Sequence, residues 1–186
     1  MTNATADSSQ PDRRPDQVWT LGGPVDATSM RNAMGAFPSG VTVLTTRLGD
    51  RSVGMTISSF ASVSLDPPLL LQCVARSAGS LPAFRIGSSV AVNVLANDQA
   101  SLARRFASKV DDRFEGVAFD TDDCGCPVLV GAAASVSGFI DRIYDAGDHV
   151  ILLIRACAVR RAGGLPLLYY SGRMHDWADT VCPVAS

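Results

Sequence analysis

The sequence has neither a strong charge of one sign nor a long hydrophobic run. Its 186 residues carry 16 Lys and Arg against 18 Asp and Glu, which gives a formal net charge of −2. Proteins that bind nucleic acid usually present a basic surface, so we expect no nucleic-acid partner. No apolar run reaches the roughly 18 residues that a membrane-spanning helix needs, so we expect no membrane partner.

Signals for export and for common nucleotide sites are also absent. Arg13 and Arg14 are not followed by the apolar segment of a secretory signal. We therefore predict a cytoplasmic protein whose five cysteines remain thiols. The sequence contains no G-x-G-x-x-G after a predicted strand and no P-loop, so the familiar loops that hold phosphate groups are not expected.

The chain does contain many short, β-branched or alternating segments separated by tight turns. They predict about seven strands with two or three short helices, over a length that suits one sizeable core. Asp26 or Thr28 is expected to cap the first helix. The acidic connection over residues 107–127 is typical of a lid or cover. Because most neighbouring strands are joined by tight turns, the pattern favours a mainly β protein built as an antiparallel barrel.

Three regions are predicted along the chain. Residues 1–25 are rich in Thr, Ser, Asp, Pro and Gln, so we expect a disordered or mobile tail. We expect Trp19 in this tail to dock on a surface or on a partner subunit. Residues 26–175 are predicted to form the single folded domain, and residues 176–186 a C-terminal tail.

Hydroxyl side chains alternate with apolar ones over residues 54–68. This alternation is typical of a half-buried strand with one polar face. A small, uncharged polar face leaves backbone N–H groups accessible, which suits a flat, phosphate-bearing ligand, although a solvent-facing strand gives the same pattern. Asp66-Pro67-Pro68 ends the strand because proline fixes φ and removes a donor. The hydroxyl residues are Thr56, Ser58, Ser59, Ser62 and Ser64.

Several separated segments occur in the order and spacing of one known family. The chain resembles the flavin reductase-like family, which has the FMN-binding split-barrel fold. The best-known members are the reductase components of two-component flavin-dependent monooxygenases. The matching segments are residues 30–43, 54–68, 92–95 with 98–99, 105–107, 112–116, 147–149 and 166–170.

The resemblance implies a flavin site along the hydroxyl-rich stretch and the segment before it. Arg76, Ser77 and Ser80 would form its phosphate end, since a cation and hydroxyl groups make an anion site. The implied flavin-binding residues are Pro38, Ser39, Val41, Met55, Thr56, Ser58, Ser59, Phe60, Arg76, Ser77, Ser80, Arg105 and Phe106. Gly147-Asp148-His149 resembles the motif that the family associates with the nicotinamide nucleotide, and His149 is the implied catalytic residue.

Two departures from the family pattern stand out. Gly138 occupies a position where related chains often carry a cysteine, which we interpret as repacking of the core. Cys124 and Cys126 form a C-x-C pair without a second ligand pair at metal-binding spacing. We interpret these two as bystander thiols and predict no metal site.

The function implied by the resemblance is that of an NAD(P)H:flavin oxidoreductase. The cofactor would be FMN or FAD, the co-substrate NADH or NADPH, and the assembly a homodimer. Reduced flavin would diffuse to a separate monooxygenase component. The alternatives are a flavin enzyme of the same fold that acts directly on an organic substrate, a non-catalytic flavin or haem module, and a structural barrel without a ligand.

Overall fold

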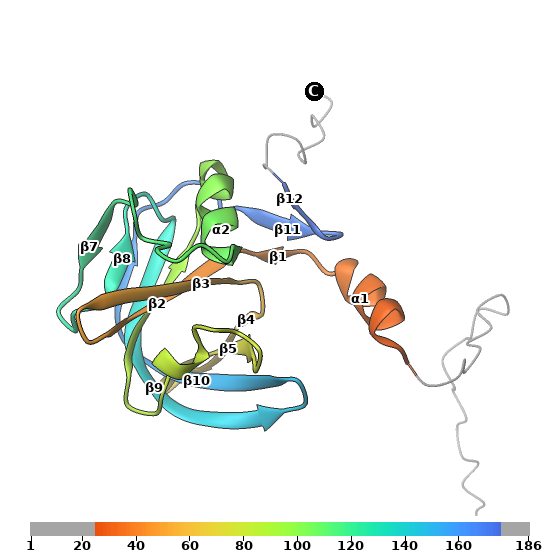
Figure 1. Cartoon of the computed structure of the whole chain (residues 1–186), viewed down its shortest axis with the longest axis horizontal. Coiled ribbons are helices and arrows are strands. Elements are labelled where there is room, and N and C mark those ends of the chain that lie inside the picture. Colours follow the sequence, from red (N-terminus) through yellow and green to blue (C-terminus); the bar gives the residue numbers. More distant parts are fainter. Residues whose placement is uncertain (1–24, 176–186) are drawn as a thin grey trace, which may run out of the picture.

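A computed structural model of the chain describes residues 25–175. Its main element is a seven-stranded antiparallel sheet in the order β3-β2-β6-β9-β10-β5-β4, which curls into a barrel (Figure 1). The predicted antiparallel barrel is therefore confirmed. The strands are β2 (Thr42–Leu48), β3 (Arg51–Ile57), β4 (Phe60–Leu65), β5 (Pro68–Ala75), β6 (Ser89–Val94), β9 (Ala134–Ala146) and β10 (His149–Arg161).

Smaller elements cover the ends of the barrel. One three-stranded sheet contains β1 (Ser39–Gly40), β11 (Leu168–Tyr170) and β12 (Arg173–His175), and a hairpin contains β7 (Phe119–Thr121) and β8 (Pro127–Leu129). The acidic connection expected over residues 107–127 thus includes a strand of its own. The helices are α1 (Ala27–Gly35), α2 (Ala100–Ala107) and the 3₁₀ turns η1 (Leu81–Ala83) and η2 (Asn97–Gln99).

The hydroxyl-rich stretch is not one strand, which corrects the sequence-based expectation. β3 and β4 lie at opposite edges of the main sheet and are joined only by Ser58 and Ser59. This crossover moves the chain from pairing with β2 to pairing with β5. The Ser59 hydroxyl holds the new position, because it accepts from the Cys73 N–H and donates to the Cys73 carbonyl, both at 3.1 Å. The barrel is consequently split between two strand edges that do not pair.

A buried amide lies beneath the crossover. The Gln72 side chain is fully buried, and its Nε2 donates to the Thr42 hydroxyl at 2.9 Å. That hydroxyl in turn donates to the Ile57 carbonyl at 2.7 Å. The chain of hydrogen bonds therefore fixes the last residue of β3 from inside the barrel. Around it packs an apolar core that includes Leu44, Val74, Val92, Ile140, Leu152 and Ile154.

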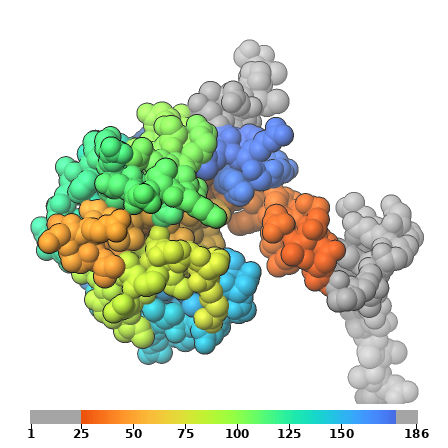
Figure 2. Space-filling view, in the orientation of Figure 1, coloured from red at the N-terminus to blue at the C-terminus, as the bar shows by residue number. Residues whose placement is uncertain are grey.

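Helix α1 stands apart from the barrel (Figures 1 and 2). Its cap is the predicted one, since the Ser29 N–H donates to the Asp26 carboxylate at 2.6 Å. None of its residues is buried. Met30 and Met34 of the helix are 51% and 56% exposed, and Phe37, which follows the helix, is 76% exposed. The apolar side chains of this segment therefore have no cover within the described part of the chain.

Two sets of predictions concern parts that the structure leaves undescribed. The expectations for the N-terminal tail, including Trp19, and for the C-terminal tail fall on residues 1–24 and 176–186, outside the described residues. Between residues 25 and 175, no helix is both long enough and apolar enough to span a membrane.

Candidate active site

The strand edge of interest is the free edge of β3, which ends at the crossover. Met55 and Thr56 are half-buried there, and Ser58, Ser59 and Phe60 are exposed at the crossover. The Thr56 hydroxyl donates to the Ala103 carbonyl of α2 at 2.6 Å, so it is already engaged. Because an unpaired strand edge presents free N–H and C=O groups, a ligand here would meet mainly backbone, together with the Ser58 hydroxyl.

The segment before β2 lies beside the same crossover. Thr42 pairs with Ile57, which brings the preceding residues to the end of β3. Pro38 is exposed and Ser39 is half-buried, so both are accessible from this side. Val41 is only 1% exposed, and its side chain belongs to the core. Its backbone is engaged as well, because its N–H donates to the Leu167 carbonyl at 3.2 Å and its carbonyl accepts from the Leu95 N–H at 3.0 Å.

Arg76 and the Gly147-Asp148-His149 turn lie together, although the sequence assigned them to different ligands. The Arg76 side chain donates from Nε to the Gly147 carbonyl at 3.0 Å and forms an ion pair with Asp145. Its backbone N–H donates to the Asp148 carbonyl at 2.9 Å. Ser77 is exposed next to it. The end of β5 thus braces the turn that carries His149.

His149 is oriented by its neighbour. Its Nδ1 lies 2.7 Å from the Asp148 carboxylate, and the hydrogen bond from His149 lowers the pKa of Asp148. An ionised carboxylate can only accept, so Nδ1 carries the proton and Nε2 is left for other partners. The imidazole is 43% exposed at the start of β10, opposite Ala75. This arrangement presents one ring nitrogen at the surface of the barrel.

The Phe106 side chain is buried and cannot contact a ligand at the free edge of β3. It is 1% exposed and packs edge-to-face on Phe114, with ring centroids 4.9 Å apart. A Cβ on Gly54 would lie 2.6 Å from the Phe106 ring, so this ring supports β3 from below. The resemblance placed Phe106 in a segment near the flavin, and the structure shows that its ring is packed inside the protein. Arg105 is half-buried and donates to the carbonyls of Arg113 at 2.8 Å and Asp112 at 3.1 Å.

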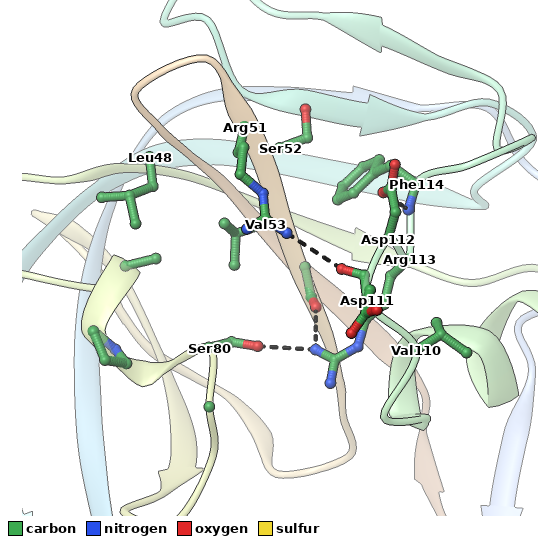
Figure 3. Close-up of a pocket in the computed structure, with 14 residues that line it drawn as sticks. Leu48, Arg51, Ser52, Val53, Ser80, Val110, Asp111, Asp112, Arg113 and Phe114 are labelled. Atoms are coloured by element: carbon green, nitrogen blue, oxygen red, sulfur yellow. Dashed lines mark hydrogen bonds between the residues drawn. The ribbon is translucent and has the colours of Figure 1, made fainter.

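Arg113 lines a pocket beside β3, and the sequence reasoning gave this residue no role. Its guanidinium lies in a pocket between β3, the η1 region and the 110–114 loop (Figure 3). Nη1 donates to the Gly54 carbonyl at 2.8 Å and to the Ser80 hydroxyl at 2.9 Å, and Nε donates to the Ser108 carbonyl at 2.9 Å. The resemblance had included the segment around Arg113 without giving this residue a role. Its partners are distant in sequence, so no local pattern reveals them.

These features fit a flavin. The free edge of β3 offers backbone groups for the polar rim of a flat ring, and the exposed Ser58 adds a hydroxyl. Ser80 and Arg113 lie at the other end of that edge, where a phosphate would find a cation and a hydroxyl. In the described part of the chain, no group of three or more His, Cys, Asp or Glu side chains could hold a metal ion.

Comparisons with known proteins agree with this geometry. The chain is 42% identical over 165 residues to the actinorhodin polyketide dimerase of Streptomyces coelicolor, covering 87% of this chain and 93% of that protein. It is 38% identical over 157 residues to the FMN reductase (NADH) SmoA of Agrobacterium fabrum, covering 84% and 89%. The Streptomyces globisporus NADH:FAD oxidoreductase SgcE6, solved in complex with NAD and FAD fragments, has a TM-score of 0.77 and 35% identity, covering 87% and 96%.

The match extends over the whole described barrel. The chain spans about half the length, 48%, of one further curated relative, a Rhizobium meliloti protein named "Probable flavin reductase", at 39% identity. The family model described as "Flavin reductase like domain" matches residues 34–178, which includes every strand from β1 to β12. The chain therefore belongs to the flavin reductase-like domain family.

Proposed function

We propose that the protein is an NAD(P)H:flavin oxidoreductase that supplies reduced FMN or FAD to a separate flavin-dependent monooxygenase. The observation that supports this proposal is the position of His149 at the start of β10, the strand that pairs with β5. Arg76, at the end of β5, holds the turn before His149 through its hydrogen bond to the Gly147 carbonyl. β5 in turn adjoins the Ser58-Ser59 crossover, so a nicotinamide and a flavin can be held on one side of the barrel. A cytoplasmic location, where NAD(P)H is supplied and thiols stay reduced, is part of the proposal.

The residues act by binding and orientation. When bound, the flavin supplies the acceptor for a hydride from the nicotinamide nucleotide. The backbone edge of β3 orients the flavin ring, with Pro38, Ser39 and Ser58 around the crossover. Asp148 fixes the His149 ring, whose Nε2 can accept a hydrogen bond from the nicotinamide carboxamide. No protein nucleophile is required, because the protein contributes proximity and alignment.

The proposal is tested by following NADH and NADPH oxidation with FMN, FAD and riboflavin in turn. We expect steady oxidation of at least one nucleotide that depends on added flavin and on enzyme concentration. A protein that binds flavin and leaves both nucleotides unoxidised would not be a reductase.

A second candidate is an enzyme of the same fold that acts directly on an organic substrate. It is favoured by the 42% identity to a relative whose name refers to polyketide dimerisation. Such an enzyme would keep its flavin through gel filtration and consume little NADH in the assay above. A colourless protein indifferent to all three flavins would instead favour a structural barrel.

A homodimer is the assembly that we propose for the active enzyme. Helix α1 stands off the barrel with Met30, Met34 and Phe37 exposed, and a second copy of the chain is the proposed cover. Sedimentation at micromolar concentration is expected to show a dimer, and Met34→Glu to shift it toward monomer. Arg31→Gln, on the same helix, is the matched control and should leave the dimer intact. A wild-type monomer at that concentration would contradict the proposal.

A further inference from the structure

Three cysteines lie where the β7–β8 hairpin meets β10. Cys124 and Cys126 lie in the turn of this hairpin, and Cys157 lies in β10. The hairpin is held against β10 by an ion pair in which Arg160 Nη1 lies 3.0 Å from Asp120 Oδ2. The sequence interpretation considered the C-x-C pair alone, and the fold adds a third thiol to that pair.

A cavity of about 210 Å³ lies between the hairpin and the strands β9 and β10. Its walls include residues 121–123 of the hairpin and residues 158–160 of β10. Cys124 directly follows the first of these segments, and Cys157 directly precedes the second. Both cysteines are exposed, so a small oxidant in the solvent can reach them.

Cys157 is the extra residue of a β-bulge. Ala156 pairs with Gly138 of β9 and Ala158 pairs with Ser137, whereas Cys157 between them has no partner in β9. A bulged residue is left out of the hydrogen-bonded ladder, and its backbone can adjust more easily than that of its neighbours. The bulge therefore gives the Cys157 side chain freedom to approach the hairpin.

The turn that carries Cys124 is fixed by a carboxylate. Asp122 Oδ1 accepts from the N–H groups of Cys124 at 2.9 Å and of Cys126 at 2.8 Å. Cys126 is 1% exposed, and burial raises its pKa to about 12. Because the thiolate is the reactive form, Cys126 remains a thiol at neutral pH. The C-x-C pair itself is therefore not the reactive pair.

The pKa of Cys124 supports the proximity of the other two thiols. Burial raises this pKa, and negative charge on Asp122 and on Cys157 raises it further. A charge on Cys157 has this effect only where the two sulfur atoms are near each other. The two exposed thiols thus form a pair across the contact between the hairpin and β10.

We propose that Cys124 and Cys157 form a reversible disulfide that ties the β7–β8 hairpin to β10. The oxidant is hydrogen peroxide, which one thiolate attacks to give a sulfenic acid and hydroxide. The sulfur of the second thiol then displaces the sulfenic hydroxyl group, so that two thiols and one peroxide give one disulfide and two waters. Reduced flavin that reacts with dioxygen releases hydrogen peroxide, and this source of oxidant rests on the proposed function. Disulfides in a reducing compartment are usually transient, which agrees with a reversible bond.

The test adds a small excess of hydrogen peroxide to the full-length protein, first reduced and then freed of reductant, and maps its tryptic peptides. We expect the peptide of residues 114–142 to become linked to the peptide of residues 156–160, and dithiothreitol to break the link. The closed loop should raise the Tm by about 5 °C or more over that of the reduced protein. Because the peroxide is added, this result does not depend on flavin reduction.

Single substitutions identify the thiols. Cys124→Ser and Cys157→Ser should each abolish both the link and the rise in Tm, and neither change affects a buried residue. Cys126→Ala is the matched control, because it removes the other thiol of the same turn and the same tryptic peptide. This control should keep both the link and the rise in Tm.

Three results would overturn the inference. Oxidation of Cys124 or Cys157 to sulfinic acid without a link would place their Cα atoms beyond the roughly 7 Å that a disulfide can bridge. A link that persists in Cys124→Ser and disappears in Cys126→Ala would assign the bond to the buried thiol. A link from either cysteine to Cys182, in place of the expected one, would show that the hairpin and β10 do not form the pair.

Discussion

Replacing Gly138 with alanine is expected to destabilise the barrel by about 3–5 kcal/mol, near the upper end for a single substitution. Gly138 lies in β9 opposite Ala156 of β10, beside a register shift between Ala156 and Ala158. A Cβ at this position would lie 2.0 Å from the Arg155 carbonyl oxygen, which is backbone and has no rotamer to adopt. Urea unfolding of both proteins, followed by far-ultraviolet circular dichroism, measures the loss.

Gly40→Ala is the matched control for this prediction. Gly40 is also a strand glycine, and a Cβ there meets no atom within 4 Å, so its effect should stay within about 0.5 kcal/mol. A Gly138→Ala protein that unfolds at the same urea concentration as the Gly40→Ala protein would show that β10 can move aside at little cost.

The close approach at Gly138 also corrects an interpretation made from the sequence. The absence of a cysteine at this position was attributed to repacking of the core. The structure gives a different cause, because the neighbouring atom is a carbonyl of the paired strand and not a side chain. A β-bulge depends on the relative register of two strands, and register is not visible in the sequence of either strand alone.

The barrel itself could be predicted from alternation and short turns, whereas its split could not. The alternation of hydroxyl and apolar residues is interrupted only at the Ser58-Ser59 pair, and two adjacent serines do not by themselves indicate that the chain leaves β2 and joins β5. The change is fixed by tertiary contacts, namely the hydrogen bonds of Ser59 with Cys73 and the buried link from Gln72 to Ile57 through Thr42. Such contacts override a local strand signal.

The candidate site was predicted only in part, again because contacts between distant residues are not visible in the local sequence. Family motifs brought out the crossover, Arg76 and the His149 turn, but not which of them touch. Arg113 was given no role because its partners, Gly54 and Ser80, are 59 and 33 residues away along the chain. Phe106 was assigned to the ligand although it is buried, because a motif identifies a segment and not the direction of its side chains.

Replacing His149 with alanine is expected to lower kcat/KM for the preferred nicotinamide nucleotide by about 10- to 100-fold, within the range of about 1–3 kcal/mol for a lost hydrogen bond and stacking area. The physical reason is orientation: Asp148 holds Nδ1, so Nε2 and the ring face are what the nucleotide would meet. Flavin affinity should stay nearly unchanged, since the crossover and the Arg113 pocket are left intact. Stopped-flow measurement of flavin reduction at several nucleotide concentrations separates binding from hydride transfer.

Asp148→Asn tests the orienting role of the carboxylate separately. The hydrogen bond from His149 lowers the pKa of the Asp148 carboxyl group, which shows that the two groups interact. An asparagine amide can still accept a hydrogen bond from Nδ1 through its oxygen but carries no negative charge. We therefore expect a smaller fall in kcat/KM than for His149→Ala. His175→Ala is the matched control, because His175 is the only other histidine of the chain. It lies in the small sheet of β11 and β12, where its Nε2 is 3.3 Å from the Tyr170 carbonyl oxygen.

If His149 has only a structural role, its replacement would instead lower thermal stability and flavin affinity together. If a stable His149→Ala protein reduces flavin at the wild-type rate, His149 is not part of the nicotinamide site.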